Sequence, residues 1–95
     1  MEGYFYKGSV ILGALHDMMH DPPRLVYTGL LLQGKRNGFG VSYYADGSPC
    51  YKGSWLYDLE QGYGKTFWKS TGLLQYEGNF SRGMKEGIGR MQETL

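Results

Sequence analysis

At 95 residues the chain has the length of a single domain, and ten Lys and Arg against nine Asp and Glu leave a net charge of +1. The charges form no blocks, which argues against the broad basic surface that nucleic acids and anionic membranes attract. The single cysteine excludes an internal disulfide framework and favours a reducing compartment. No segment approaches the roughly 20 apolar residues of a membrane span, and the N-terminus lacks the order of a signal peptide, so we expect a cytoplasmic protein.

The first 26 residues are the least regular part of the chain. The stretch Tyr6 to Val10 has the form of the pentad repeated further along, with valine in its last place, but no Gly-x-Gly triplet follows it. We interpret residues 1–26 as a degenerate N-terminal repeat or hairpin, with two longer strands joined by a loop at residues 16–23. Pro22-Pro23 in that loop cannot lie inside a helix or a central strand. A short helix over residues 10–20 is the alternative, although the glycine within it would cost about 1 kcal/mol.

The rest of the chain is a repeat array. Its opening tyrosines, Tyr27, Tyr51 and Tyr76, are 24 and 25 residues apart. Each copy begins with the pentad Tyr-x-Gly-x-aromatic and continues, at the same distance, with a Gly-x-Gly triplet. The first copy departs from this pattern by having Leu31 in the fifth place of the pentad. Self-similarity at a fixed period is the signature of a repeat architecture. The predicted repeats are residues 27–50, 51–75 and 76–95.

Each repeat predicts a hairpin of two strands. The first and fifth residues of the pentad share one face of a strand because side chains alternate, and the glycine between them leaves bare backbone against which a neighbouring ring can pack. Short polar connections, Leu56 to Gln61 and Ser81 to Glu86, precede the triplet that begins each returning strand. Adjacent aromatic residues in the returning strands point to opposite faces. We therefore predict an all-β fold, an elongated antiparallel β-meander of repeated hairpins with about six strands in residues 27–92.

Three patterns resemble catalytic or ligand-binding motifs but are explained more simply as parts of the fold. His16-Asp17-x-x-His20 has the spacing of a zinc motif, but a double proline follows it within two residues, so we interpret it as a polar loop, with incidental or catalytic zinc as the alternatives. The Gly-x-Gly triplets lack the third glycine and the helix of a dinucleotide site. Rings interleaved with lysines, as in residues 65–69, lack the basic excess that nucleic-acid binding needs. We expect no enzyme activity, catalytic residue, cofactor or metal, and no nucleic acid.

The repeated pattern closely resembles the MORN repeat (membrane occupation and recognition nexus). The resemblance covers residues 27 to about 91, is specific in the second and third copies and is weaker in the first. It implies one β-hairpin per repeat, stacked into an elongated, twisted and grooved sheet. It also implies a docking or scaffolding role without enzyme activity, linked in some members with membranes and acidic phospholipids. Nothing functional is carried over to residues 1–26, which depart from the family.

We predict a non-catalytic protein-interaction or scaffolding module, with peripheral binding to acidic phospholipids as the alternative. A single-layer sheet with aromatic residues on both faces leaves some of them uncovered, and its terminal strands have unpaired backbone groups. We therefore expect a homodimer, with the region Ile11 to Leu32 as an alternative lid within the chain. The groove is predicted to contact a peptide or helix through six aromatic side chains. These are Tyr44, Tyr51, Trp55, Trp68, Tyr76 and Phe80.

Overall fold

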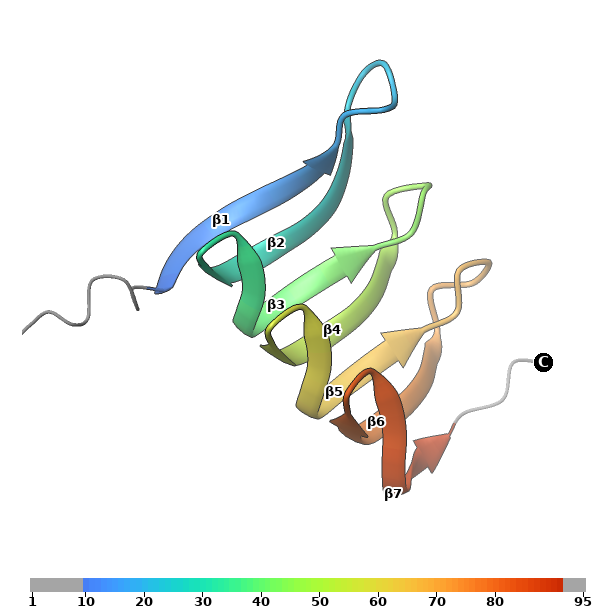
Figure 1. Ribbon diagram of the computed structural model, residues 1–95. Coiled ribbons are helices and arrows are strands. Elements are labelled where there is room, and N and C mark those ends of the chain that lie inside the picture. The colour runs from blue at the N-terminus through green and yellow to red at the C-terminus, as the bar shows by residue number, and fades with distance from the viewer. Residues whose placement is uncertain (1–9, 92–95) are drawn as a thin grey trace, which may run out of the picture.

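The chain forms one antiparallel sheet. A computed structural model describes residues 10–91, with side chains described through residue 86. Seven strands follow one another in the sheet in the order of the sequence (Figure 1). They are β1 (Val10–Asp17), β2 (Arg24–Leu32), β3 (Lys35–Tyr43), β4 (Pro49–Leu56), β5 (Leu59–Phe67), β6 (Leu74–Ser81) and β7 (Met84–Met91). The predicted all-β meander is confirmed, and its extents of 52 × 38 × 16 Å are those of a thin plate.

Two strands, not the alternative helix, occupy the N-terminal segment. β1 pairs with β2 along its whole length, so the region proposed as a lid is part of the same sheet. The loop predicted at residues 16–23 begins two residues too early, because His16 and Asp17 continue β1 beyond a register shift and face Leu25 and Arg24. The Arg24 guanidinium donates a hydrogen bond to the Asp17 carboxylate at 3.0 Å. This ion pair extends the strand into a stretch whose polarity is typical of a loop.

The turns inside the repeats are shorter than predicted. Residues 57–58 and 82–83 alone connect the strands, so Leu59 and Met84 already belong to β5 and β7. Both residues of each turn have positive φ, at 46° and 72° in the first and 51° and 83° in the second. Such turns match the right-handed twist of a hairpin, and they usually reveal themselves by Asn-Gly or Asp-Gly. Tyr57-Asp58 carries no such signal, which is why the polar stretch around it reads as a longer connection.

A row of glycines crosses the sheet. Each neighbouring pair of strands from β1 to β6 places glycine opposite glycine. We call this set the glycine row; it consists of Gly13, Gly29, Gly40, Gly53, Gly64 and Gly78. In the first strand of every repeat the register shifts beside the row, for example between Gly53 and Trp55. The strands bend strongly and curl toward the short turns (Figure 1). Bulges of this kind sharpen the bend of a strand.

The bend encloses a chain of aromatic rings on one face of the sheet. Neighbouring rings meet edge to face, with centroids 5.0–5.5 Å apart. We call this set the aromatic ladder; it runs in the order Tyr27, Trp55, Tyr51, Phe80 and Tyr76. Leu31 joins the ladder where the first repeat lacks its aromatic residue, and all six side chains are at most 6% exposed. Edge-to-face pairs add about 0.5–1.5 kcal/mol each beyond the burial of their surface. The ladder is therefore the core of the protein, buried without a second layer.

Tyrosine and glycine fit together within the first two repeats, and the closest fit is at a different glycine from the one predicted. The Tyr51 ring lies over Gly64 of the returning strand, where an added Cβ would come 2.3 Å from the hydroxyl oxygen. At Gly53, where we expected the ring to lie, an added Cβ would come closest to the Cα of Gly64, at 2.5 Å, and would lie 2.7 Å from the Tyr51 hydroxyl oxygen. The Tyr51 hydroxyl donates to the carbonyl of Ser54 at 2.8 Å, and burial raises the pKa of Tyr51 to about 12. The glycine row thus allows close approach of backbone and ring.

The turns of the second and third repeats dock on the preceding repeat. The backbone N–H of Asp58 donates to the carbonyl of Arg36, and the Asp58 carboxylate accepts from the backbone N–H and Nε of Arg36 at 2.8 and 3.0 Å. Burial raises the pKa of Asp58, but these hydrogen bonds and the charge of Arg36 outweigh it, so the pKa lies below 3.8. One repeat later Gly83 donates to the carbonyl of Glu60. These contacts fix the angle between repeats.

Candidate interaction surface

The six aromatic residues predicted to contact a partner do not form one site. Four belong to the aromatic ladder and are 1–4% exposed. These are Tyr51, Trp55, Tyr76 and Phe80. Tyr44 and Trp68 follow the far ends of β3 and β5, where the Tyr44 hydroxyl donates to the carbonyl of Phe67 at 2.6 Å. The ladder rings therefore have a packing role, and partner contact by any of the six stays a prediction.

The Trp55 side chain makes contacts within the chain on several sides. Its ring meets Tyr27 and Tyr51 edge to face, and its indole N–H donates to the carbonyl of Gly40 at 3.2 Å. The Arg36 guanidinium carbon lies 4.5 Å from the centroid of the same ring. A buried indole N–H needs such a partner. Little of this side chain remains for an external ligand.

The residues between the scaffold positions lie on the opposite face of the sheet, which we call the outer face. Side chains alternate along a strand, so the variable residues of the pentad and of the Gly-x-Gly triplet point away from the ladder. In the first two repeats they are Thr28, Leu30 and Phe39, and Lys52, Ser54 and Tyr63. Val41 and Lys65, two residues after Phe39 and Tyr63, share their face. The middle residues of the triplets, Phe39 and Tyr63, are 60% and 52% exposed. The repeat thus presents large side chains that do not belong to its core.

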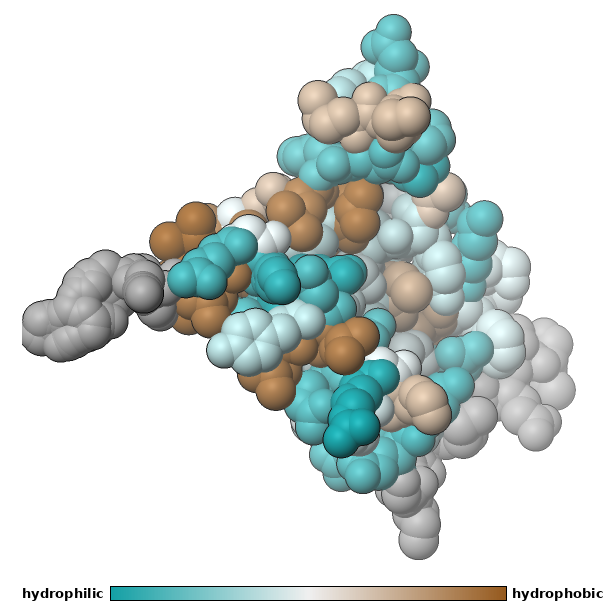
Figure 2. All heavy atoms as spheres, in the orientation of Figure 1, coloured by the Kyte–Doolittle hydropathy of each residue, from teal (hydrophilic) through white to brown (hydrophobic). Residues whose placement is uncertain are grey.

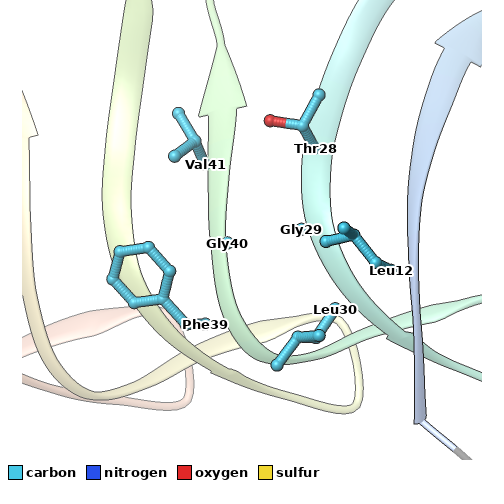
Figure 3. Close-up of a pocket in the computed structure, with 7 residues that line it drawn as sticks. All are labelled: Leu12, Thr28, Gly29, Leu30, Phe39, Gly40 and Val41. Atoms are coloured by element: carbon cyan, nitrogen blue, oxygen red, sulfur yellow. The ribbon is translucent and has the colours of Figure 1, made fainter.

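An apolar hollow of about 420 Å³ lies on the outer face across β1, β2 and β3. Figure 3 shows Leu12, Leu30 and Phe39 around the bare backbone of Gly29 and Gly40, which forms the floor. The remaining lining residues are Thr28 and Val41. The hydroxyls of Thr28 and Tyr43 are 2.8 Å apart and satisfy each other, so the hollow has little free hydrogen-bonding capacity. It is suited to apolar side chains.

A second hollow, of about 320 Å³, continues the first toward β5. Phe39 lines both, and the second also has Lys52, Ser54, Tyr63 and Lys65 around Gly53. Lys52 and Lys65 stand directly opposite each other in the register of β4 and β5, and both are exposed. The outer face therefore changes from apolar over the first three strands to basic over the next two.

Three stretches of the sequence match the family model of the MORN repeat, at residues 27–48, 51–72 and 76–92, which together make up more than half of the chain. The chain belongs to the MORN repeat family. No curated protein and no solved structure matches it. MORN repeats generally serve as interaction or membrane-binding modules, so the family agrees with a binding surface on the sheet but does not choose between a protein and a lipid.

The first strand adds exposed apolar surface to this MORN array. β1 is the first strand in the order of the sheet, and Val10, Ile11 and Leu12 are 47%, 59% and 78% exposed. In the view of Figure 2 hydrophobic atoms gather over β1 and β2, whereas hydrophilic atoms prevail around the loop that joins them.

Within residues 10–91 no helix is long and apolar enough to cross a membrane.

Asp17 and His20 of the His16-Asp17-x-x-His20 motif form a polar network with Arg24 at the end of the first hairpin. The Asp17 carboxylate accepts from the backbone N–H of Met19, lies 3.2 Å from Nδ1 of His20 and is paired with Arg24. The Met19 hydrogen bond and the neighbouring His20 and Arg24 lower the pKa of Asp17. His20 Nε2 also contacts the Arg24 guanidinium at 3.0 Å. In the described part of the chain no group of three or more His, Cys, Asp and Glu is placed to hold a metal ion.

Sequence reasoning missed the outer-face residues for an identifiable reason. It followed the residues that recur, and these are the ones that build the MORN scaffold. Phe39 and Tyr63 were available as a signal, because each is a large aromatic residue in the variable place of a Gly-x-Gly triplet. Strand alternation puts that place on the face away from the ladder. Both side chains are more than half exposed, which makes them candidates for contact with a partner.

Proposed function

We propose that this MORN array is a non-catalytic protein-interaction module, working in a reducing cytoplasmic setting, that binds its partner on the outer face. The observation that carries the proposal is the apolar hollow, whose rim residues Leu12 and Phe39 are 78% and 60% exposed. Neither side chain contributes to the aromatic ladder. Exposed apolar side chains that gather around one hollow support an interaction site there.

The test is a differential capture experiment. Phe39→Ser should lose the proteins that the wild-type chain retains from its native source. Leu73→Ser serves as the matched control, because Leu73 is 55% exposed in the turn before β6 and lies outside both hollows. Unchanged near-UV circular dichroism would show that the ladder is intact in both variants. A retained set that is the same for wild type and Phe39→Ser would contradict the proposal.

We also propose that the chain forms a homodimer through the β1 edge. The exposed Val10, Ile11 and Leu12 and the position of β1 at the end of the strand order of residues 10–91 support it, since the edge strand of a sheet pairs readily with a second copy. In such a dimer Gly13 would lie opposite Gly13 of the second copy, which would continue the register in which neighbouring strands place glycine opposite glycine. Light scattering should give twice the monomer mass, and Leu12→Lys should reduce it to the monomer. A monomer mass at all concentrations would reject the dimer.

Lipid binding is the second candidate, because Lys52 and Lys65 stand beside the exposed rings of Phe39 and Tyr63. A basic residue near an anionic leaflet contributes about 1 kcal/mol, so two lysines supply little. Glu77 faces Lys65 from β6, and the whole chain carries a net charge of only +1. We therefore rank it below protein binding. Flotation with vesicles containing phosphatidylserine separates the two.

A further inference from the structure

The second hollow contains an unfavourable pair of like charges. Lys52 and Lys65 are directly opposite on β4 and β5, and both side chains are exposed on the outer face. Ser54 and Tyr63 line the same hollow. Like charges placed directly opposite across two strands destabilise a sheet. An anion held between the two ammonium groups would remove that cost, so the position is favourable for a carboxylate.

The surroundings of the two lysines leave their charges available. Among the residues that the structure describes, neither lysine has a carboxylate within ion-pairing distance. The Lys52 ammonium lies 5.6 Å from the centroid of the Phe67 ring, a contact that leaves its hydrogen-bond donors free for an acceptor. Glu77 faces Lys65 from β6, and its carboxylate accepts a hydrogen bond from the Tyr63 hydroxyl.

The basic hollow and the apolar hollow are close enough for one short ligand. Phe39 lines both, and the apolar hollow extends from it toward Leu12 and Leu30. Neighbouring strands are about 4.8 Å apart, so the lysines of β4 and β5 lie roughly 10 Å from the middle of the apolar hollow. An extended peptide advances about 3.3 Å per residue and covers this distance in about three residues.

We infer that the outer face binds an extended protein segment that places apolar side chains in the first hollow and, about three residues away, a carboxylate between Lys52 and Lys65. The inference rests on the proposed function and names the chemistry of its partner. A protein segment is favoured over a membrane because Glu77 lies next to the basic hollow. A flat anionic surface would meet that carboxylate, whereas a single acidic side chain would not.

The experiment selects random peptides displayed on phage against four forms of the full chain: wild type, Lys52→Gln/Lys65→Gln, Phe39→Ser and the control Lys69→Gln. Lys69 is an exposed lysine in the turn before β6, outside the hollow. Peptides retained by wild type and Lys69→Gln but lost from the double variant should share an apolar pair and an acidic residue about three places away. Replacing that residue by its amide in a synthetic peptide should weaken binding about tenfold, and added salt should do the same.

The outcomes separate the inference from the function on which it rests. Neutral peptides that bind the double variant as well as wild type, and are lost only with Phe39→Ser, would overturn the carboxylate site and leave protein binding intact. Retention of no peptide, or retention indifferent to Phe39→Ser, would overturn both. Lysine-dependent flotation on phosphatidylserine vesicles without any retained acidic peptide would assign the basic hollow to a lipid and overturn the inference.

Discussion

Gly53→Ala tests whether the glycine row is required for the fold. A Cβ at this position would lie 2.5 Å from the Cα of Gly64 and 2.6 Å from the carbonyl oxygen of Tyr63. Both atoms are backbone, so β4 and β5 must separate by at least half an ångström to restore even a 3.0 Å contact. Overpacking costs 1–3 kcal/mol, and because backbone cannot rotate away we expect about 3 kcal/mol here. For a chain of this size that lowers the Tm by about 12–24 °C.

Two control variants separate this steric effect from others. At Gly13 the added Cβ would meet only the end of the Leu31 side chain, at 2.9 Å, so Gly13→Ala should cost about 1 kcal/mol or less. Gly47 has open space around it but a φ of +91°, so Gly47→Ala reports the conformational cost alone, about 1–2 kcal/mol. Urea unfolding followed by tryptophan fluorescence and far-UV circular dichroism gives each free energy of unfolding, provided that the two transitions coincide. Equal losses for Gly53→Ala and Gly13→Ala would refute the close-approach argument.

Three further variants test the ladder and the turn contacts. Tyr51→Phe removes the hydrogen bond to Ser54 and should cost about 1 kcal/mol at neutral pH. The pKa of Tyr51 is raised in the folded protein, so wild type loses stability from about pH 10 toward pH 12. The difference in free energy of unfolding between wild type and Tyr51→Phe should shrink over that range, and a constant difference would contradict this. The lowered pKa of Asp58 stabilises the fold above pH 3.8. The difference in free energy of unfolding between wild type and Asp58→Asn, measured in urea, should therefore vanish as the pH falls below that value. A difference that persists in acid would exclude the contact with Arg36 as its source. Leu31→Ala should cost about 2–5 kcal/mol if Leu31 fills the ladder, as thermal unfolding will show.

The sequence determined the sheet through two simple regularities. Alternation of side chains placed Tyr51 and Trp55 on one face, and their rings do meet at 5.0 Å. The repeated triplet located the returning strands because it lies within each of them, beginning three residues after the start of the strand. Both regularities are local, depending on residues near each other in the chain. This is why they could be read without knowing how the strands bend.

The bend itself was beyond such reasoning. Periodicity treats a strand as straight, so it predicted rings that need a second layer, whereas curvature beside the glycine row buries Tyr51 and Trp55 within one chain. The Tyr57-Asp58 turn was missed because both residues adopt positive φ without glycine, held by the contact of Asp58 with Arg36 from the preceding repeat. That contact joins residues 22 positions apart. Neither effect has a signature within a short window of sequence.

The division between recurring and variable positions puts the packed core of this array on one face and its exposed variable side chains on the other. Changing a scaffold residue such as Tyr51 or Gly64 disturbs ring packing and strand approach together, because the two touch each other. Changing Phe39 or Tyr63 alters side chains that are more than half exposed on the outer face and lie outside the aromatic ladder, although Tyr63 also donates a hydrogen bond to Glu77. Surface substitutions usually change stability by less than about 0.5 kcal/mol. On the proposed function, the variable triplet residues Phe39 and Tyr63 can therefore change the ligand preference of the outer face without loss of the fold.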